Sequence, residues 1–249
     1  MIQTVFNRYE RKFLMTDSVY QALRLRLAPY MQVDDYGLTT ISNIYYDTPD
    51  RHFLNRSIEK PAYKEKLRLR SYGVPDMDST VFLEIKKKYK GIVNKRRIAL
   101  PLREAYDYIE KGDRPNLPDC QILREFDYFL SRWPMEKGVY VAYDRIALFG
   151  KEDPSFRVTF DTNIRSRKKG MALENGDMGE LLLPEGWHLM ESKILGATPL
   201  WFSHILSELE IRPVSFSKVG NILLKDRGML YLPSLPGSEN EKRSRRIGA

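Results

Sequence analysis

Residues 64–70 read Lys-Glu-Lys-Leu-Arg-Leu-Arg, which places basic side chains at every even position and leucines at 67 and 69. Successive side chains of a strand point to opposite faces, so this segment predicts a strand with one cationic and one apolar face. The same kind of alternation recurs in residues 82–86, 95–100, 143–146 and 156–161. Because each apolar face requires burial, we expect an antiparallel sheet whose apolar side is covered by helices.

Hydrophobic periodicity divides the rest of the chain into further strands and a few helices. One helix is expected to start after Thr16 as its N-cap, and another where Thr198 caps and Pro199 takes the first helical position. Residues 217–227 predict a short helix, and residues 165–184 are left unassigned. The pattern favours the α+β class on an antiparallel sheet and leaves closure of that sheet open. Strands are expected over 3–14, 38–47, 64–72, 80–88, 93–100, 138–148, 155–164 and 187–195, and helices over 17–28, 102–111 and 119–132.

Of the 249 residues, residues 1–232 are expected to form one domain, because no Pro/Gly/Ser-rich linker divides them. Residues 233–249 are polar and basic, which predicts a disordered tail. A single cysteine, Cys120, excludes an internal disulfide and is typical of a reducing compartment. The sequence has neither a secretory pattern at its start nor an apolar run of the roughly 20 residues that a membrane span needs. We therefore expect a cytoplasmic protein.

Positive charge dominates the sequence, with 41 Lys and Arg against 33 Asp and Glu and a formal net charge of +8. A solvated strand face usually mixes both signs, because like charges opposite each other on neighbouring strands are destabilising. Basic residues recurring on strand after strand favour a bound polyanion over a merely solvated surface. Interleaved aromatic residues keep nucleic acid as an alternative that we do not favour. These aromatic residues are Tyr45, Tyr46, Tyr63, Tyr72 and Tyr143.

Several motifs that bind phosphates or metals are missing from the sequence. It contains no G-x-x-x-x-G-K-[ST], G-x-G-x-x-G or H-E-x-x-H motif and no paired cysteines. The three histidines, His52, His188 and His204, are scattered. Phosphate binding is therefore expected from Lys and Arg side chains and not from a glycine-rich loop.

The order of short motifs resembles that of the triphosphate tunnel metalloenzymes, and most closely the catalytic domain of the vacuolar transporter chaperone (VTC) polyphosphate polymerases. The resemblance covers about residues 5–222 and implies a closed tunnel of eight antiparallel strands lined with Lys and Arg, with helices packed outside. Its matching segments are residues 8–12 (RYERK), 44–49 (IYYDTP), 66–73 (KLRLRSYG), 82–86 (FLEIK), 95–97 (KRR), 143–145 (YDR), 157–161 (RVTFD), 190–193 (MESK) and 216–218 (FSK).

The resemblance also implies roles for individual residues. Glu191 is expected to hold a divalent metal, Mn²⁺ or Mg²⁺, and to take part in catalysis. Arg8 stands where the wider superfamily has a glutamate, which argues against a multi-carboxylate metal site. The other expected catalytic residues are Lys12, Arg68, Arg70, Lys86, Arg145 and Arg157, and the expected substrate-binding residues are Arg8, Glu10, Lys95, Arg97, Tyr143, Lys193, Ser217 and Lys218.

The activity that the resemblance implies is transfer of the γ-phosphoryl group of ATP onto a growing polyphosphate chain. ATP and inorganic polyphosphate or triphosphate are thus the expected partners, and nucleic acid is not. A metal-dependent hydrolase and a non-catalytic polyphosphate-binding module remain alternatives at this point. The eukaryotic polymerase carries an inositol-phosphate-sensing domain and has membrane-embedded partners. This chain contains neither the domain nor a membrane span, and both a membrane partner and the oligomeric state are left open.

Overall fold

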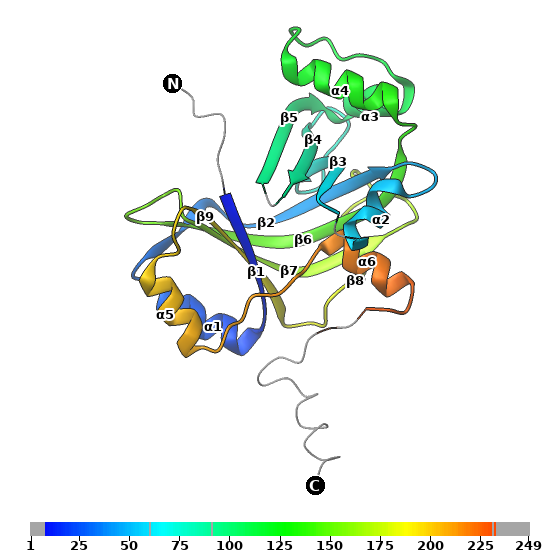
Figure 1. Ribbon diagram of the computed structural model, residues 1–249. Coiled ribbons are helices and arrows are strands. Elements are labelled where there is room, and N and C mark those ends of the chain that lie inside the picture. The colour runs from blue at the N-terminus through cyan, green and yellow to red at the C-terminus, as the bar shows by residue number, and fades with distance from the viewer. Residues whose placement is uncertain (1–7, 60, 91, 231, 233–249) are drawn as a thin grey trace.

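The computed structural model describes residues 8–59, 61–90, 92–230 and 232. They form an antiparallel sheet with helices, so the α+β class is confirmed (Figure 1). The strands are β1 (Arg8–Thr16), β2 (Met31–Asp47), β3 (Tyr63–Tyr72), β4 (Thr80–Tyr89), β5 (Ile92–Pro101), β6 (Glu136–Gly150), β7 (Arg157–Arg167), β8 (Glu180–Leu181) and β9 (Trp187–Leu195). The helices are α1 (Asp17–Leu27), α2 (His52–Glu59), α3 (Leu102–Lys111), α4 (Gln121–Arg132), α5 (Leu200–Glu208) and α6 (Lys218–Asp226).

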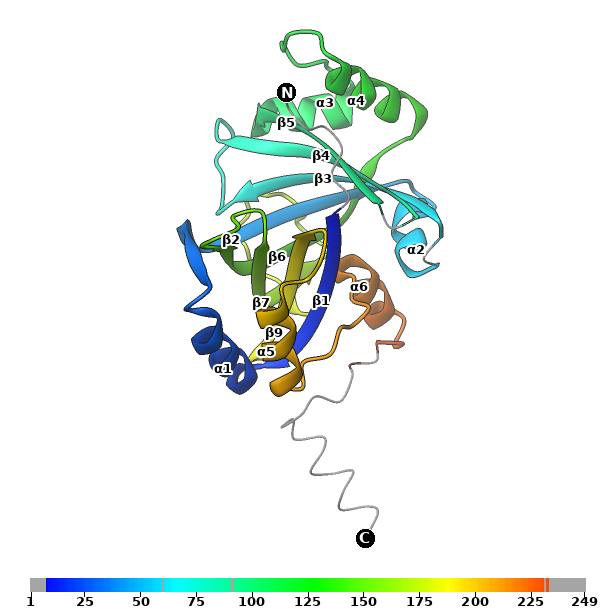
Figure 2. The same cartoon turned by 60° about the vertical axis from the view of Figure 1, so that its left-hand side comes forward.

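The sheet has nine strands in the order β1-β9-β7-β6-β2-β3-β4-β5, with the short β8 pairing beside β7. It is strongly curved (Figure 2), and Lys86 of β4 lies with its Nζ 3.7 Å from a carboxylate oxygen of Glu10 in β1, near the opposite end of the strand order. The expected closed barrel is nevertheless not confirmed, because no backbone ladder joins β1 to β5 within the described residues. The free edge of β1 is covered instead by the segment before α6, where Val214 N donates to Lys12 O at 2.7 Å and Phe13 bridges Pro213.

The helices cover the apolar outer face of the curved sheet at two places. Helices α3 and α4 lie over β3, β4 and β5, where Leu67, Leu83 and Phe126 are fully buried. Helices α1 and α5 lie beside each other over β1, β7 and β9, where they bury Phe160 and Met190. Burial of these apolar residues places the alternate residues, many of them charged, on the opposite face of the sheet.

Helices α2 and α6 pack together on the opposite face of the sheet, which we call the inner face, at one of its ends. Leu54 of α2 and Val219 and Ile222 of α6 are buried with Val141 and Leu189 of the sheet. Helix α6 confirms the helix expected over 217–227, whereas α2 was not predicted. The Asp47 carboxylate at the end of β2 accepts hydrogen bonds from the backbone N–H groups of Thr48, Phe53 and Leu54, which anchors the start of α2. One side chain thus satisfies donors that a helix N-terminus leaves free.

Other differences from the expected elements are local. Strand β2 begins at Met31, seven residues early, because residues 31–33 pair with residues 148–150 before a register shift. The unassigned segment 165–184 supplies the end of β7 and the short β8. Thr198 does not cap α5, since Pro199 occupies the N-cap position. No helix among the described residues is long and apolar enough to cross a membrane, and the tail expected over 233–249 lies outside the described residues.

Candidate functional site

Charged side chains gather on the inner face of the curved sheet, which we define by residues that pair across neighbouring strands. Lys12 pairs with Glu191, and Glu191 with Thr159 on the next strand. Arg68 pairs with Glu84, and Glu84 in turn with Arg97. Residues in register share a face, so parity on each strand gives the whole set. The inner face comprises Glu10, Lys12, Asn43, Tyr45, Lys66, Arg68, Arg70, Glu84, Lys86, Lys95, Arg97, Tyr143, Arg145, Arg157, Thr159, Asp161, Glu191 and Lys193.

The first ion-pair network joins β1, β6, β7, β9 and α6. Arg145 donates from Nε and Nη2 to the two oxygens of Asp161 at 2.5 and 2.7 Å, and Lys218 donates to Asp161 Oδ2 at 2.5 Å. Glu191 lies 3.2 Å from Lys12 Nζ and 3.4 Å from Lys218 Nζ. Burial alone raises the pKa of the Glu191 carboxyl, but Lys12, Lys218 and Arg145 outweigh it and hold this pKa well below its usual range. The carboxylate is therefore ionised at neutral pH.

The second network is centred on Glu84, which is 0% exposed. Its carboxylate accepts from Arg68 Nε at 2.5 Å and from Arg97 Nε at 2.6 Å, and it lies 2.5 Å from Lys95 Nζ. Burial opposes ionisation, but Arg68, Arg70 and Lys95 hold the pKa of Glu84 far below its ordinary value. Arg68, Lys95 and Arg97 therefore reach the inner face with part of their charge already balanced.

Three cations on the inner face belong to neither ion-pair network, because no carboxylate of the described residues lies within 4.0 Å of their side-chain nitrogens. They are Lys66, Arg70 and Lys193. Arg70 is only 6% exposed and donates to neutral partners, Asn43 Oδ1 at 3.0 Å and Tyr143 Oη at 3.1 Å. Burial and the neighbouring cations Lys86 and Lys64 hold the pKa of Lys66 well below its ordinary value. A partly desolvated cation without a counter-ion is stabilised by an arriving anion.

Two polar groups lie among these charges. Tyr143 is buried, with Lys218 Nζ 4.4 Å and the Arg145 guanidinium carbon 5.0 Å from its ring centroid. Burial raises its pKa, but Arg70, Arg145 and Lys218 outweigh burial and lower the pKa of Tyr143 to about 8. Thr159, opposite Glu191 in the register, has a buried Oγ1 without a hydrogen-bond partner in the described residues. A buried hydroxyl of this kind is available to a bound oxygen ligand.

The donor set around Glu191 fits a divalent cation that arrives with its phosphates. Mg²⁺ is commonly held by one or two carboxylates, with phosphate oxygens and water completing its shell. Glu191 offers the carboxylate, and the Thr159 hydroxyl lies on the neighbouring strand. Within the described ranges, no group of three or more His, Cys, Asp or Glu is placed to hold a metal by itself. The metal expected at Glu191 thus stays a prediction.

The remaining residues of the predicted site lie at several separate positions in the fold. Lys86 lies 3.7 Å from Glu10, and Arg157 is exposed at the rim, 3.7 Å from Asp34. Ser217 is the N-cap of α6, where its Oγ accepts from Gly220 N at 3.2 Å. The side chain of Arg8 lies outside the described residues. The predicted roles of these side chains toward substrate stay predictions.

Sequence reasoning did not include several inner-face residues in the candidate site. Lys66 shares its parity with Arg68 and Arg70, so alternation alone could have included it. Glu84 and Asp161 share faces with predicted basic residues, but their pairing with specific cations depends on strand order. Asn43 and Thr159 carry no charge, and no sequence signal indicates that their polar atoms lie beside Arg70 and Glu191.

Comparison with models of protein families finds a match to one family. Residues 7–223 match the family model of the VTC domain. No curated protein sequence matches the chain. Similar solved structures include a candidate adenylate cyclase from Vibrio parahaemolyticus, 13% identical with a TM-score of 0.48 over 89% of this chain and 99% of that chain. Another is a candidate adenylyl cyclase from Hippeastrum with a dominant triphosphatase activity, 14% identical with a TM-score of 0.49 over 90% of this chain and 97% of that chain.

Proposed function

Because the chain belongs to the VTC domain family, we propose that it is a polyphosphate polymerase, which transfers the γ-phosphoryl group of ATP onto the end of a polyphosphate chain. The observation that carries the proposal is the surplus of cations over carboxylates on the inner face. Lys66, Arg70 and Lys193 have no carboxylate of the described residues within ion-pair distance. A chain of phosphates supplies negative charge along its whole length, which a single carboxylate ligand cannot do.

The proposed chemistry rests on positioning and charge. Phosphoryl transfer passes through a loose transition state whose charge spreads over the phosphoryl oxygens, so fixed cations lower its energy. Arg70 and Arg145 offer guanidinium forks to these oxygens, and the lysines offer point charges. The attacking group is a terminal oxygen of the polyphosphate itself, so the protein needs no nucleophile. Mn²⁺ or Mg²⁺ held by Glu191 would neutralise further charge on the phosphates.

The two ion-pair networks orient cations of the inner face before substrate binds. Asp161 and Glu84 are 0% exposed and fix the directions of Arg145 and Arg68 before substrate binds. Donors that are already oriented need little rearrangement when charge develops, which is the source of electrostatic catalysis. The buried carboxylates thus have a positioning role in the proposed reaction, while Lys66, Arg70 and Lys193 contact phosphate together with the oriented arginines.

Analysis of the products separates this proposal from hydrolysis and from simple binding. The protein is incubated with ATP and Mn²⁺, and the products are separated on a gel that resolves long phosphate chains. We expect ADP together with long chains, and no chains from a Glu191→Gln variant that keeps its melting temperature. ADP with only inorganic phosphate would identify water as the acceptor and contradict the polymerase. If ATP is not consumed, the protein is a non-catalytic binding module.

A further inference from the structure

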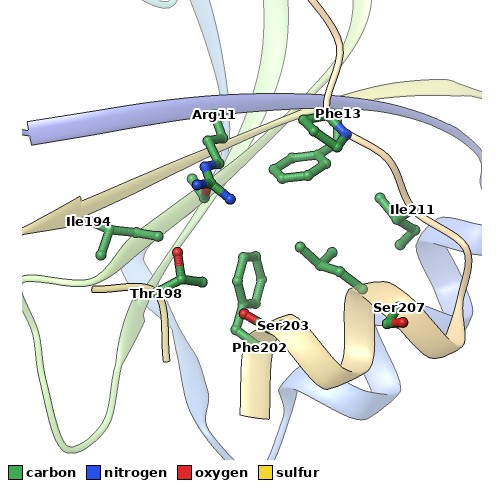
Figure 3. Close-up of a pocket in the computed structure, with 11 residues that line it drawn as sticks. Arg11, Phe13, Ile194, Thr198, Phe202, Ser203, Ser207 and Ile211 are labelled. Carbon is green, nitrogen blue, oxygen red and sulfur yellow. The ribbon is translucent and has the colours of Figure 1, made fainter. Parts of the chain in front are cut away.

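A second concave site lies on the outer face of the sheet, away from the phosphate-binding residues. The outer faces of β1 and β9 and the helix α5 line a pocket of about 240 Å³ that is open on one side (Figure 3). Arg11 of β1 points into it from one side, across from Thr198 and Ser203 near the start of α5. Arg11 and Ser192 are out of phase with Lys12 and Glu191 on the same strands, so they face away from the inner face.

The walls of this pocket are mainly apolar. Phe13, Ile194, Phe202, Leu206 and Ile211 line it, and all five belong to the buried cluster between the sheet and α5. An apolar cavity of roughly 150 Å³ is large enough to bind benzene. A pocket of about 240 Å³ therefore has room for a phenyl group or a short alkyl chain. The body of a matching ligand is compact and apolar.

Two polar groups in the pocket, on Ser192 and Arg11, lack a hydrogen-bond or ion-pair partner among the described residues. Ser192 is 0% exposed, and its Oγ has no hydrogen-bond partner in the described residues. A buried hydroxyl left in this state is unfavourable, and a ligand oxygen satisfies it. Arg11 is exposed and forms no ion pair with the described residues, and its guanidinium points toward the same space. The guanidinium fork matches the two oxygens of a carboxylate.

We propose that this pocket binds a small monocarboxylate with a compact apolar body, whose carboxylate pairs with Arg11 and hydrogen-bonds to Ser192. One cation in the pocket matches one negative charge, whereas a phosphate monoester carries closer to two. The site is separate from the proposed polymerase site and does not depend on that function. An occupant contacts the outer sides of the two strands that carry Lys12 and Glu191, so its binding stabilises this part of the sheet.

Octanoate and 3-phenylpropanoate are suitable probes, with 1-octanol as a neutral match for the first. Ligands of about ten non-hydrogen atoms at ordinary efficiency bind in the millimolar range. We expect both acids to raise the melting temperature of the wild type and to bind measurably in calorimetry. Octanol and the Arg11→Gln variant should show binding weaker by about tenfold or more, because a charge-assisted hydrogen bond is lost. Ser192→Ala should weaken binding by roughly threefold to tenfold.

Three controls test whether octanoate binds in this pocket and not elsewhere on the protein. Arg103→Gln removes an exposed arginine on α3, outside the pocket residues, and should leave octanoate binding unchanged. Ser203→Phe places a ring in the pocket and should abolish binding. Saturating triphosphate should leave octanoate affinity unaltered, whereas competition would place octanoate among the inner-face cations. The proposal is overturned if neither acid binds at millimolar concentration, or if Arg11→Gln and Ser192→Ala bind octanoate as the wild type does.

Discussion

Neighbouring arginines on one strand have different environments. Arg68 donates to the buried carboxylate of Glu84, whereas Arg70, two residues on, donates to the neutral Asn43 and Tyr143. Removing Arg68 therefore takes one cation away from a buried carboxylate, which is destabilising. Removing Arg70 takes away a positive charge that has no carboxylate of the described residues within ion-pair distance. Arg70 is thus the better probe of a bound anion, although the two residues look equivalent in the sequence.

The lowered pKa of Lys66 leads to a prediction about protons. Burial and the cations around Lys66 disfavour its charged form, and phosphates beside it remove that penalty. Triphosphate binding should therefore raise the pKa of Lys66, and it should be accompanied by more proton uptake in the wild type than in Lys66→Met. The uptake is measured by calorimetry in buffers of different ionisation enthalpy. Equal uptake in both proteins would exclude Lys66 from the phosphate site, and Lys87→Met, on the outer face, serves as the control.

Tyr143 predicts a dependence of anion affinity on pH. Despite its burial, nearby cations lower its pKa to about 8, so the phenol becomes a phenolate as pH rises through that value. The new negative charge repels phosphate and offsets the charges of Arg70 and Lys218. Triphosphate affinity should therefore fall above about pH 8 in the wild type, by at most tenfold per pH unit. Tyr143→Phe cannot ionise and should show a shallower profile; identical profiles would show that Tyr143 does not titrate beside the phosphates.

Helix α6 places the cation Lys218 beside the carboxylates of the inner face. Lys218 is its first residue, and the preceding Ser217 caps it. Val219 and Ile222 hold the helix against the sheet through the apolar cluster shared with α2. The position of Lys218 near Asp161 and Glu191 therefore depends on the cap and on packing, as well as on the charges themselves.

Substitutions of Ser217 separate a capping role from a contact with substrate. Ser217→Ala should lower the free energy of unfolding by about 1 kcal/mol, because the Gly220 N–H loses its acceptor. Triphosphate affinity should fall with it as Lys218 loses its fixed position. Ser217→Asn keeps a good N-cap and should restore most of both quantities, measured by urea unfolding and calorimetry. If Asn restores stability but not affinity, the hydroxyl itself contacts the phosphates.

Most strands could be predicted from the sequence, because a half-buried strand shows its alternation directly. Strands β3, β4 and β5 lie within one or two residues of the expected ranges. Helix α2 could not be predicted in this way, since its start depends on Asp47 accepting from residues six and seven positions later. The first turn of a short helix anchored by such a contact has no periodic signal of its own.

At the scale of the whole molecule, the sequence predicts the cationic face but not how the sheet ends. Alternation of side chains is the same in an open sheet and a closed barrel, so closure could not be read from it. The difference lies at β1, whose edge accepts from Val214 and bridges Pro213 instead of pairing with β5. Likewise, the inner-face carboxylates Glu84, Asp161 and Glu191 were visible in the sequence, but each pairs with a cation of another element. Arg68 of β3 pairs with Glu84, Lys218 of α6 with Asp161, and Lys12 of β1 with Glu191.

The central claim is that cations of the inner face, and not the positive charge of the molecule as a whole, bind a chain of phosphates. Arg70→Met and Lys87→Met each remove one positive charge while keeping the aliphatic stem. Arg70 lies on the inner face, whereas Lys87 lies on the outer face, 3.5 Å from Glu125. Calorimetric titration of triphosphate into both variants and the wild type, in one buffer, compares them directly.

A charge-assisted contact contributes about 1.5–3 kcal/mol, so Arg70→Met should bind triphosphate roughly 10- to 150-fold more weakly than the wild type. Lys87→Met should stay within about twofold, because Lys87 lies on the outer face beside Glu125 and salt screens its field across the sheet. Equal, modest losses in both variants would contradict the account, since only the net charge of the protein would then matter.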